Sequence, residues 1–198
     1  MSKLISSLLL VLFLSLTLFE SQPIFAADDS QTLDIRIEGD AIAMVEARLE
    51  LLVPPDVVFT VLTDYSNWPV LFPHGVEIRI EKLSDDSVVT DMTIPNKIFS
   101  WSTHLKARSR ETLPYKLETT LVDGDFHQYR QVWKLTPMLD GKYTRAELTL
   151  TLQPKGWIMR LVPEFLYRWL LRGDLEAHFE KLRKQVRLRH GTELREAS

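Results

Sequence analysis

VPPDVVFTVLTDYSNWPVLF, residues 53–72, separates one long strand-like stretch from a series of shorter ones. Pro54, Pro55 and Asp56 indicate a helix start, because proline is tolerated in the first turn of a helix. The apolar residues 57, 58, 61 and 62 then recur at the spacing of one helical face. The helix is expected to end within residues 64–69, because Trp68 precedes a proline and is biased towards extended geometry, and a second helical turn is expected around residues 70–72.

Residues 33–53, before this segment, read as one strand. Val45, Ala47, Leu49 and Leu51 alternate with charged residues, which is the two-residue period of a half-buried strand. Gly39-Asp40 predicts a turn or a bulge within it.

Six further strands are expected after the segment, with turn residues such as Asp123-Gly124 and Asp140-Gly141 between them. They are residues 76–83, 87–94, 98–108, 115–122, 126–136 and 142–153. One long helix follows, from Trp157 to about Arg189. The sequence therefore predicts an α+β fold in which a seven-stranded antiparallel curved sheet wraps around a long C-terminal helix, with two short helices after the first strand.

Three motifs in this order, Asp64-Tyr65 with Trp68-Pro69, Gly124-x-Phe126 and Trp133-x-Leu135-x-Pro137, resemble those of the START-like helix-grip superfamily. That group includes the polyketide cyclase/dehydrase and lipid-transport proteins and the coenzyme-Q-binding START proteins. The resemblance covers residues 40–187. It implies a fold built around an apolar cavity that holds a hydrophobic small molecule.

Residues 1–27 have the pattern of a secretory signal peptide: Lys3, an uncharged apolar run from Leu4 to Phe19, and small residues at 26–27 before an acidic pair. Cleavage after Ala26 is preferred to a retained anchor, because the run is shorter than the roughly 20 residues that span a bilayer. We therefore expect residues 28–198 to form one exported domain with its core at 40–187, periplasmic or otherwise extracytoplasmic.

Composition narrows the function further. The chain has no cysteine, which excludes disulfides and thiol chemistry, and its net charge of −3 does not favour nucleic-acid binding. The five histidines lack metal-ligand spacing, and the seven glycines form no phosphate loop, so neither a metal nor a cofactor is expected. A monomer is sufficient for everything the sequence indicates.

Strand alternation assigns each residue to one face of the sheet. The apolar parity carries no Asp, Glu, Lys or Arg in the expected strands, so an uncharged inner wall is predicted. The candidate ligand-cavity residues are Met92, Phe99, Trp101, Thr103, Tyr115, Leu117, His127, Tyr129, Gln131, Trp133 and Leu148 on the sheet, with Phe165 and Trp169 on the helix. For any single one of them, plain core packing is the alternative.

Three functions remain open. An uncharged wall favours a carrier of a lipid, isoprenoid quinone or sterol-like compound over an enzyme, because acid–base catalysis needs a tuned titratable group. The alternative is a cyclase/dehydrase acting on a polyketide-like substrate, with His127, Tyr129 and Tyr115 as the only proton handlers, so no catalytic residue is assigned. A docking protein with a filled interior is the third. Two tryptophans and neighbouring arginines in residues 155–172 predict a cavity mouth that touches a membrane transiently.

Overall fold

The computed structural model describes residues 30–72, 75–82, 87–95, 102–156 and 162–196. In these ranges the chain forms eight strands, two α-helices before the third strand, a 3-10 turn between those helices, and one long C-terminal helix. The strands are β1 (Gln31–Glu38), β2 (Ile42–Leu51), β3 (Glu77–Lys82), β4 (Ser87–Pro95), β5 (Ser102–Thr112), β6 (Lys116–Gly124), β7 (Phe126–Met138) and β8 (Tyr143–Pro154). The helices are α2 (Pro55–Thr63), η1 (Tyr65–Asn67), α3 (Trp68–Leu71) and α4 (Glu164–Glu196).

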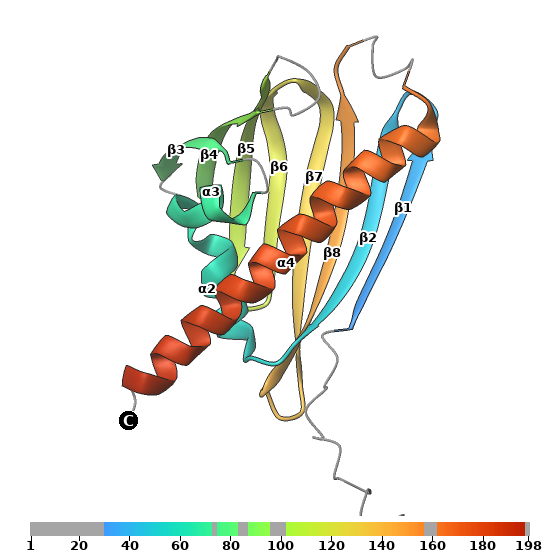
Figure 1. Ribbon diagram of the computed structural model, residues 1–198. Helices are drawn as coiled ribbons and strands as arrows, with labels where there is room; N and C mark the ends of the chain where they lie inside the picture. Colours follow the sequence, from blue (N-terminus) through green and yellow to red (C-terminus); the bar gives the residue numbers. More distant parts are fainter. Residues whose placement is uncertain (1–29, 73–74, 83–86, 96–101, 157–161, 197–198) are drawn as a thin grey trace, which may run out of the picture.

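All eight strands join one antiparallel sheet in the order β1-β2-β8-β7-β6-β5-β4-β3. The sheet curves, and α4 lies diagonally across its concave face (Figure 1). The α2–η1–α3 segment covers the same face beside α4. The helix-grip arrangement predicted from the sequence is thus confirmed.

The strand count differs from the prediction by one. Residues 33–53 are two strands, because the chain reverses at Gly39 and Ala41, which have φ values of 45° and 59°. β1 therefore pairs back onto β2, with Gln31 opposite Leu49. Gly39-Asp40 is a hairpin turn, and β1 becomes an edge of the sheet.

Gly124 is a glycine for a steric reason. Its φ is 124°, and a Cβ atom there would lie 2.4 Å from the carbonyl oxygen of His104. The register between β5 and β6 shifts nearby, between Lys106 and Ala107, and any side chain at Gly124 would meet the backbone of β5. The glycine of the Gly124-x-Phe126 motif thus has a steric role in the pairing of β5 with β6.

Two of the three apolar clusters of the described residues make up most of the core. The larger one joins the inner face of β2 and β6–β8 to α2 and α4, with Trp133 meeting the buried Phe179 edge to face at 6.1 Å. The smaller one joins β4 and β5 to η1 and α3, and includes Met92, Leu105 and Trp68. Because each large side chain buried from water contributes about 1.5–3 kcal/mol, these contacts are the main force that holds α4 on the sheet.

Candidate functional site

The inner face of the sheet follows the predicted alternation over most of its area. Met92, Leu117, Trp133 and Leu148 are all buried there, in contact with one of the two clusters. Thr103 is half-buried on the same face, opposite Ile94 of β4. Three of these predicted residues meet in the larger cluster, Met92 lies in the smaller one, and Thr103 belongs to neither.

A row of uncharged polar groups crosses this apolar face. Ser109, Thr119 and Gln131 are successive cross-strand neighbours on β5, β6 and β7. The Ser109 and Thr119 hydroxyls are 2.9 Å apart, and the Tyr129 hydroxyl donates to Oε1 of Gln131 at 3.1 Å. Burial raises the pKa of Tyr129 well above its ordinary value, so this hydroxyl stays a neutral donor. The row offers hydrogen bonds without charge.

Tyr129 lies between the two clusters. It and Val61 of α2 pack against both clusters, and both are only half-buried. Leu121 and Phe126, from the ends of β6 and β7, are also half-buried and pack against the smaller cluster. The inner face is therefore not fully closed over these four side chains.

One charged group does lie on this face, so the predicted charge-free wall is wrong at Glu111. β5 continues to Thr112 rather than ending at 108, and the alternation of Ala107 and Ser109 brings Glu111 to the inner side. The hydroxyl of the buried Tyr65 donates to Oε1 of Glu111 at 2.8 Å. Burial and the adjacent carboxylate both raise the pKa of Tyr65. This pair ties η1 to β5 at the border of the face.

Two predicted lining residues lie elsewhere. Tyr115 is half-exposed in the turn between β5 and β6. His127 is exposed, because a register shift between Phe126 and Gln128 adds a residue to β7 and interrupts the alternation. Phe126 takes the inward place and contacts the Tyr129 ring at 5.8 Å. Phe99 and Trp101 lie outside the described residues.

The two predicted helix residues are on the surface. Phe165 and Trp169 are 75% and 67% exposed in the first turns of α4. Tyr167 between them points inward, where it is buried against Ala41 and Ala43 of the β1–β2 hairpin. The start of α4 therefore has an apolar side that the described residues do not cover.

Polar contacts fasten the flanks of α4. Arg172 donates to the carbonyl oxygen of Leu33 in β1 at 3.3 Å. On the other flank, Nδ1 of His178 donates to the carbonyl oxygen of Leu71 at 3.0 Å, and Lys181 donates to that of Phe72. These last two bonds satisfy carbonyls at the C-terminal end of α3, where helices lack internal partners.

Burial among aromatic rings shapes the chemistry of His178. Desolvation lowers the pKa of His178 to about 4, and the nearby Lys181 ammonium adds to this, while the bond to Leu71 opposes it. The rings of Phe72 and Phe179 lie 5.4 and 6.1 Å away. A neutral imidazole that donates to a backbone carbonyl has a structural role, and none of the predicted site residues takes part in this hydrogen bond.

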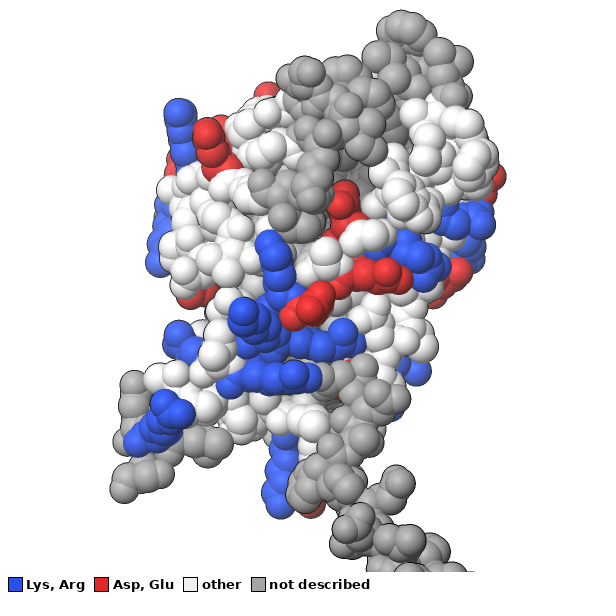
Figure 2. Space-filling model, in the orientation of Figure 1, with Lys and Arg blue, Asp and Glu red and all other residues white. Residues whose placement is uncertain are grey.

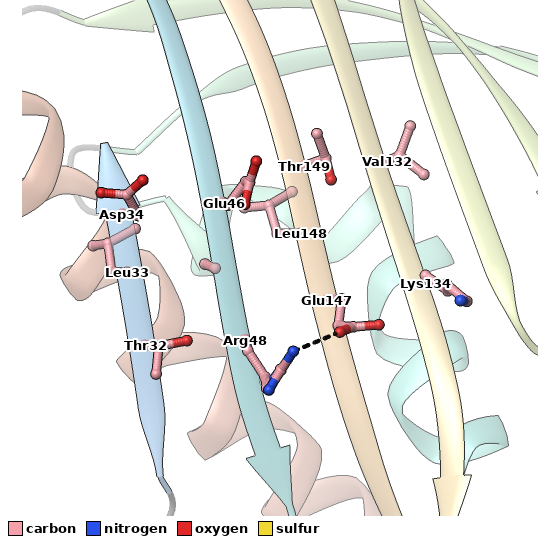
Figure 3. A pocket seen from close by; sticks show the side chains of 11 residues that line it. Thr32, Leu33, Asp34, Glu46, Arg48, Val132, Lys134, Glu147, Leu148 and Thr149 are labelled. Atoms are coloured by element: carbon pink, nitrogen blue, oxygen red, sulfur yellow. Dashed lines mark hydrogen bonds and ion pairs between the residues drawn. The ribbon is translucent and has the colours of Figure 1, made fainter. Parts of the chain in front are cut away.

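A hollow of about 530 Å³ lies on the outer face of the sheet, over β1, β2, β8 and β7, and not on the inner face where the sequence predicted a cavity (Figure 3). Its lining is charged: Asp34, Glu46, Arg48, Lys134 and Glu147 project into it. Arg48 pairs with Glu147 at 3.2 Å. Groups of this kind do not suit an apolar ligand, because a ligand there would strip water from charges without replacing it.

Comparison with known proteins identifies the fold family. The family described as "Polyketide cyclase / dehydrase and lipid transport" matches residues 51–179, which is more than half of the chain. The chain belongs to this family. No curated protein sequence matches it at a significant level.

Solved structures of the same fold share few residues with it. A protein from Thermus thermophilus is 18% identical with a TM-score of 0.62, covering 72% of this chain and 96% of its own. A START superfamily protein from Mycobacterium smegmatis is 19% identical with a TM-score of 0.57, covering 73% and 97%. The Zhui aromatase/cyclase from Streptomyces sp. R1128 is 16% identical with a TM-score of 0.55, covering 73% and 91%. At this identity the likeness establishes the fold alone.

In the described part of the chain, no helix is both long and apolar enough to cross a bilayer. Sequence reasoning did not place Ser109 or Glu111 on the inner face, and it named Tyr65 only as part of a motif. Ser109 and Glu111 continue the parity of Thr103 and Leu105, so extending β5 past residue 108 would have found both.

Proposed function

We propose that this is an exported protein that binds a hydrophobic small molecule, such as a lipid, an isoprenoid quinone or a sterol-like compound, on the inner face of its sheet beneath α4. The observation that carries the proposal is the combination of half-buried inward apolar side chains with an uncharged polar row at Tyr129 and Gln131. Neutral donors and acceptors orient an apolar ligand through its few polar atoms and leave the rest to apolar contact.

Membership of a family named for both lipid transport and polyketide cyclisation is consistent with this class of ligand. Glu111 does not weaken the proposal, because Tyr65 binds its carboxylate at the border of the inner face. The signal-like residues 1–27 support a location outside the cytoplasm.

The test has two parts. Organic extraction of the purified protein followed by mass spectrometry should release a stoichiometric apolar compound. An uncharged naphthylamine probe should bind to the extracted protein, and Leu121→Trp should weaken that binding by filling the inner face. Val122→Trp is the matched control, since Val122 is the exposed neighbour on the same strand. A protein that carries no apolar compound and binds no probe would remove the proposal.

The cyclase/dehydrase alternative has one observation in its favour, namely that an aromatase/cyclase shares the fold. Of its three expected proton handlers, only Tyr129 lies on the inner face, because His127 and Tyr115 are exposed. Turnover of a polyketide-like substrate that Tyr129→Phe abolishes while binding persists would favour this alternative.

We also propose that the exposed apolar start of α4 touches a lipid surface while ligand is exchanged. Phe165 and Trp169 flank Arg168, and aromatic rings beside a cation suit a membrane interface. Flotation with phosphatidylglycerol vesicles should fall in a Phe165→Ala/Trp169→Ala variant. Unchanged flotation would count against this contact.

A further inference from the structure

The opposite end of the protein from Phe165 carries a second set of exposed apolar side chains. Leu113 and Leu139, in the β5–β6 and β7–β8 turns, are 71% and 70% exposed. The half-exposed Tyr115 and Leu52 lie at the same end, after β5 and β2. We call these four residues the turn-end patch. A single exposed leucine is ordinary, but four from three neighbouring connections are not expected of a surface that meets only water.

The connections that carry the patch are neighbours at one end of the sheet. β6 pairs with β7, and the amide of Leu135 donates to the carbonyl oxygen of Tyr115 at 2.7 Å. Leu51 of β2 pairs with Thr144 of β8, and the Thr144 hydroxyl donates to the carbonyl oxygen of Val53 at 2.7 Å. The three connections therefore project from one end of the sheet.

Leu139 is energetically unfavourable in its turn, both in its backbone conformation and in its exposure. Its φ is 48°, in the left-handed region that glycine and asparagine adopt far more readily than leucine. The turn thus accepts backbone strain and also exposes an aliphatic side chain at its tip, although an asparagine would relieve both costs. Such a residue indicates that the tip meets something apolar.

Cations surround this end. Lys142 is exposed in the same turn as Leu139, although the neighbouring Asp140 offsets its charge. The C-terminal half of α4 adds Lys181, Arg183, Lys184, Arg187 and Arg189, of which Arg189 pairs with Glu193 at 3.3 Å. Figure 2 shows Lys and Arg gathered over this lower half of α4, and Figure 1 shows it pointing to the same side as the β7–β8 turn. Apolar tips beside clustered cations match the chemistry of an anionic lipid surface.

The chain also enters the domain at this end. The amide of Glu50 donates to the carbonyl oxygen of Ser30 at 3.1 Å, and β1 starts opposite Leu49 (Figure 1). The 29 residues before Ser30 include the uncharged run Leu4–Phe19. Ten residues separate that run from Ser30, and they can extend at most about 35 Å. The chain therefore enters the domain on the side of the turn-end patch.

We propose that the turn-end patch docks on an anionic phospholipid bilayer. This contact is distinct from the one at the start of α4. The two contacts lie at opposite ends of the molecule, and the 33 residues of α4 span about 50 Å, so a bilayer that meets the turns does not meet the start of α4. The patch sets the orientation of the bound domain and leaves the start of α4 facing away from that bilayer.

The absence of cysteine makes a direct test simple. Leu139→Cys and Leu113→Cys in the full chain are labelled with an environment-sensitive fluorophore and reconstituted with vesicles of phosphatidylcholine and phosphatidylglycerol. Both labels should shift to shorter emission wavelength and be quenched by spin-labelled lipid. Ile80→Cys is the control, because Ile80 is an exposed apolar residue on the edge strand β3.

Charge reversal tests whether docking of the patch depends on the basic residues around it. Lys142→Glu/Lys184→Glu should cut the docked fraction of the Leu139→Cys label by at least tenfold relative to the undocked, since each basic residue near an anionic surface contributes a several-fold preference. Arg79→Glu, an exposed residue of β3, should leave it unchanged. Labels at 139 and 113 that stay aqueous on vesicle-bound protein, or that shift no more than the label at 80, overturn the proposal. Ligand binding on the inner face does not enter this readout, so the two proposals fail separately.

Discussion

The stability of this protein should fall between pH 7 and pH 5 because of one histidine. Neutral His178 donates a hydrogen bond to the carbonyl oxygen of Leu71, among the rings of Phe72 and Phe179 and beside the Lys181 ammonium. An added proton would place a charge in this apolar site, next to another positive charge. The unfolded chain has no such restriction and takes up the proton at its ordinary pKa.

The size and sign follow from the two pKa values. The pKa of His178 is about 4 in the folded protein against an ordinary 6.5. Between these values the unfolded state binds more protons, so the free energy of unfolding decreases as pH falls and is fully retained only above 6.5. A tenfold change in an equilibrium corresponds to about 1.4 kcal/mol, so the full effect is at most about 3 kcal/mol. Between pH 7 and pH 5 it amounts to about 2 kcal/mol.

Urea titration followed by tryptophan fluorescence at pH 7, 6 and 5 measures this change. His178→Asn is the decisive variant, because its side-chain amide can donate to Leu71 and does not titrate. It should lose about 2 kcal/mol of the pH dependence. His190→Asn, on the same helix about three turns later, is the control and should keep it. A His178→Asn protein with the slope of the natural chain would refute the reasoning.

Three further changes test the packing by thermal or urea unfolding. Gly124→Ala should lower the free energy of unfolding by more than about 2 kcal/mol, because its Cβ would meet the His104 carbonyl at 2.4 Å. Gly141→Ala, whose Cβ meets open space, should lower it by about 1 kcal/mol through backbone strain alone. Equal losses would contradict the steric argument. Phe179→Ala should cost about 3–5 kcal/mol, since Phe179 is fully buried, and Phe165→Ala at the exposed start of α4 should cost little. Tyr65→Phe should cost about 1–3 kcal/mol, because Glu111 would lose its buried donor, and a neutral result would show that water replaces that hydroxyl.

The order of the elements and the sorting of residues between the two faces could be predicted because both depend on local period and turn chemistry. The alternation that placed Met92, Leu117 and Leu148 inward is a property of each strand by itself. The same rule failed at His127, because a bulge adds one residue and inverts the parity. A bulge arises from how β7 meets β8, and the sequence of β7 alone carries no sign of it.

Contacts between residues far apart in the chain could not be predicted from the sequence. The Gly39-Asp40 turn predicts a bend, but only the match of Ile35 with Val45 across β1 and β2 makes the bend a hairpin. Tyr65 meets Glu111 from 46 residues away, and His178 meets Leu71 from 107 residues away. Contacts at such separation depend on how the layers pack.

The fastening of α4 has a mechanical consequence. Its middle is bound to the sheet by dry contacts around Phe179 and Leu182, while its flanks are bound by side-chain donors to the backbone of β1 and α3. Water can replace a donor at a half-exposed carbonyl for about 1 kcal/mol, whereas parting the dry contacts costs about 25 cal/mol for each Å². We therefore expect α4 to tilt about its apolar middle, so that the polar contacts of one flank break while those of the other flank remain. A ligand bound on the inner face, as proposed above, would then leave past Arg172 or past His178 without disrupting the contacts around Phe179.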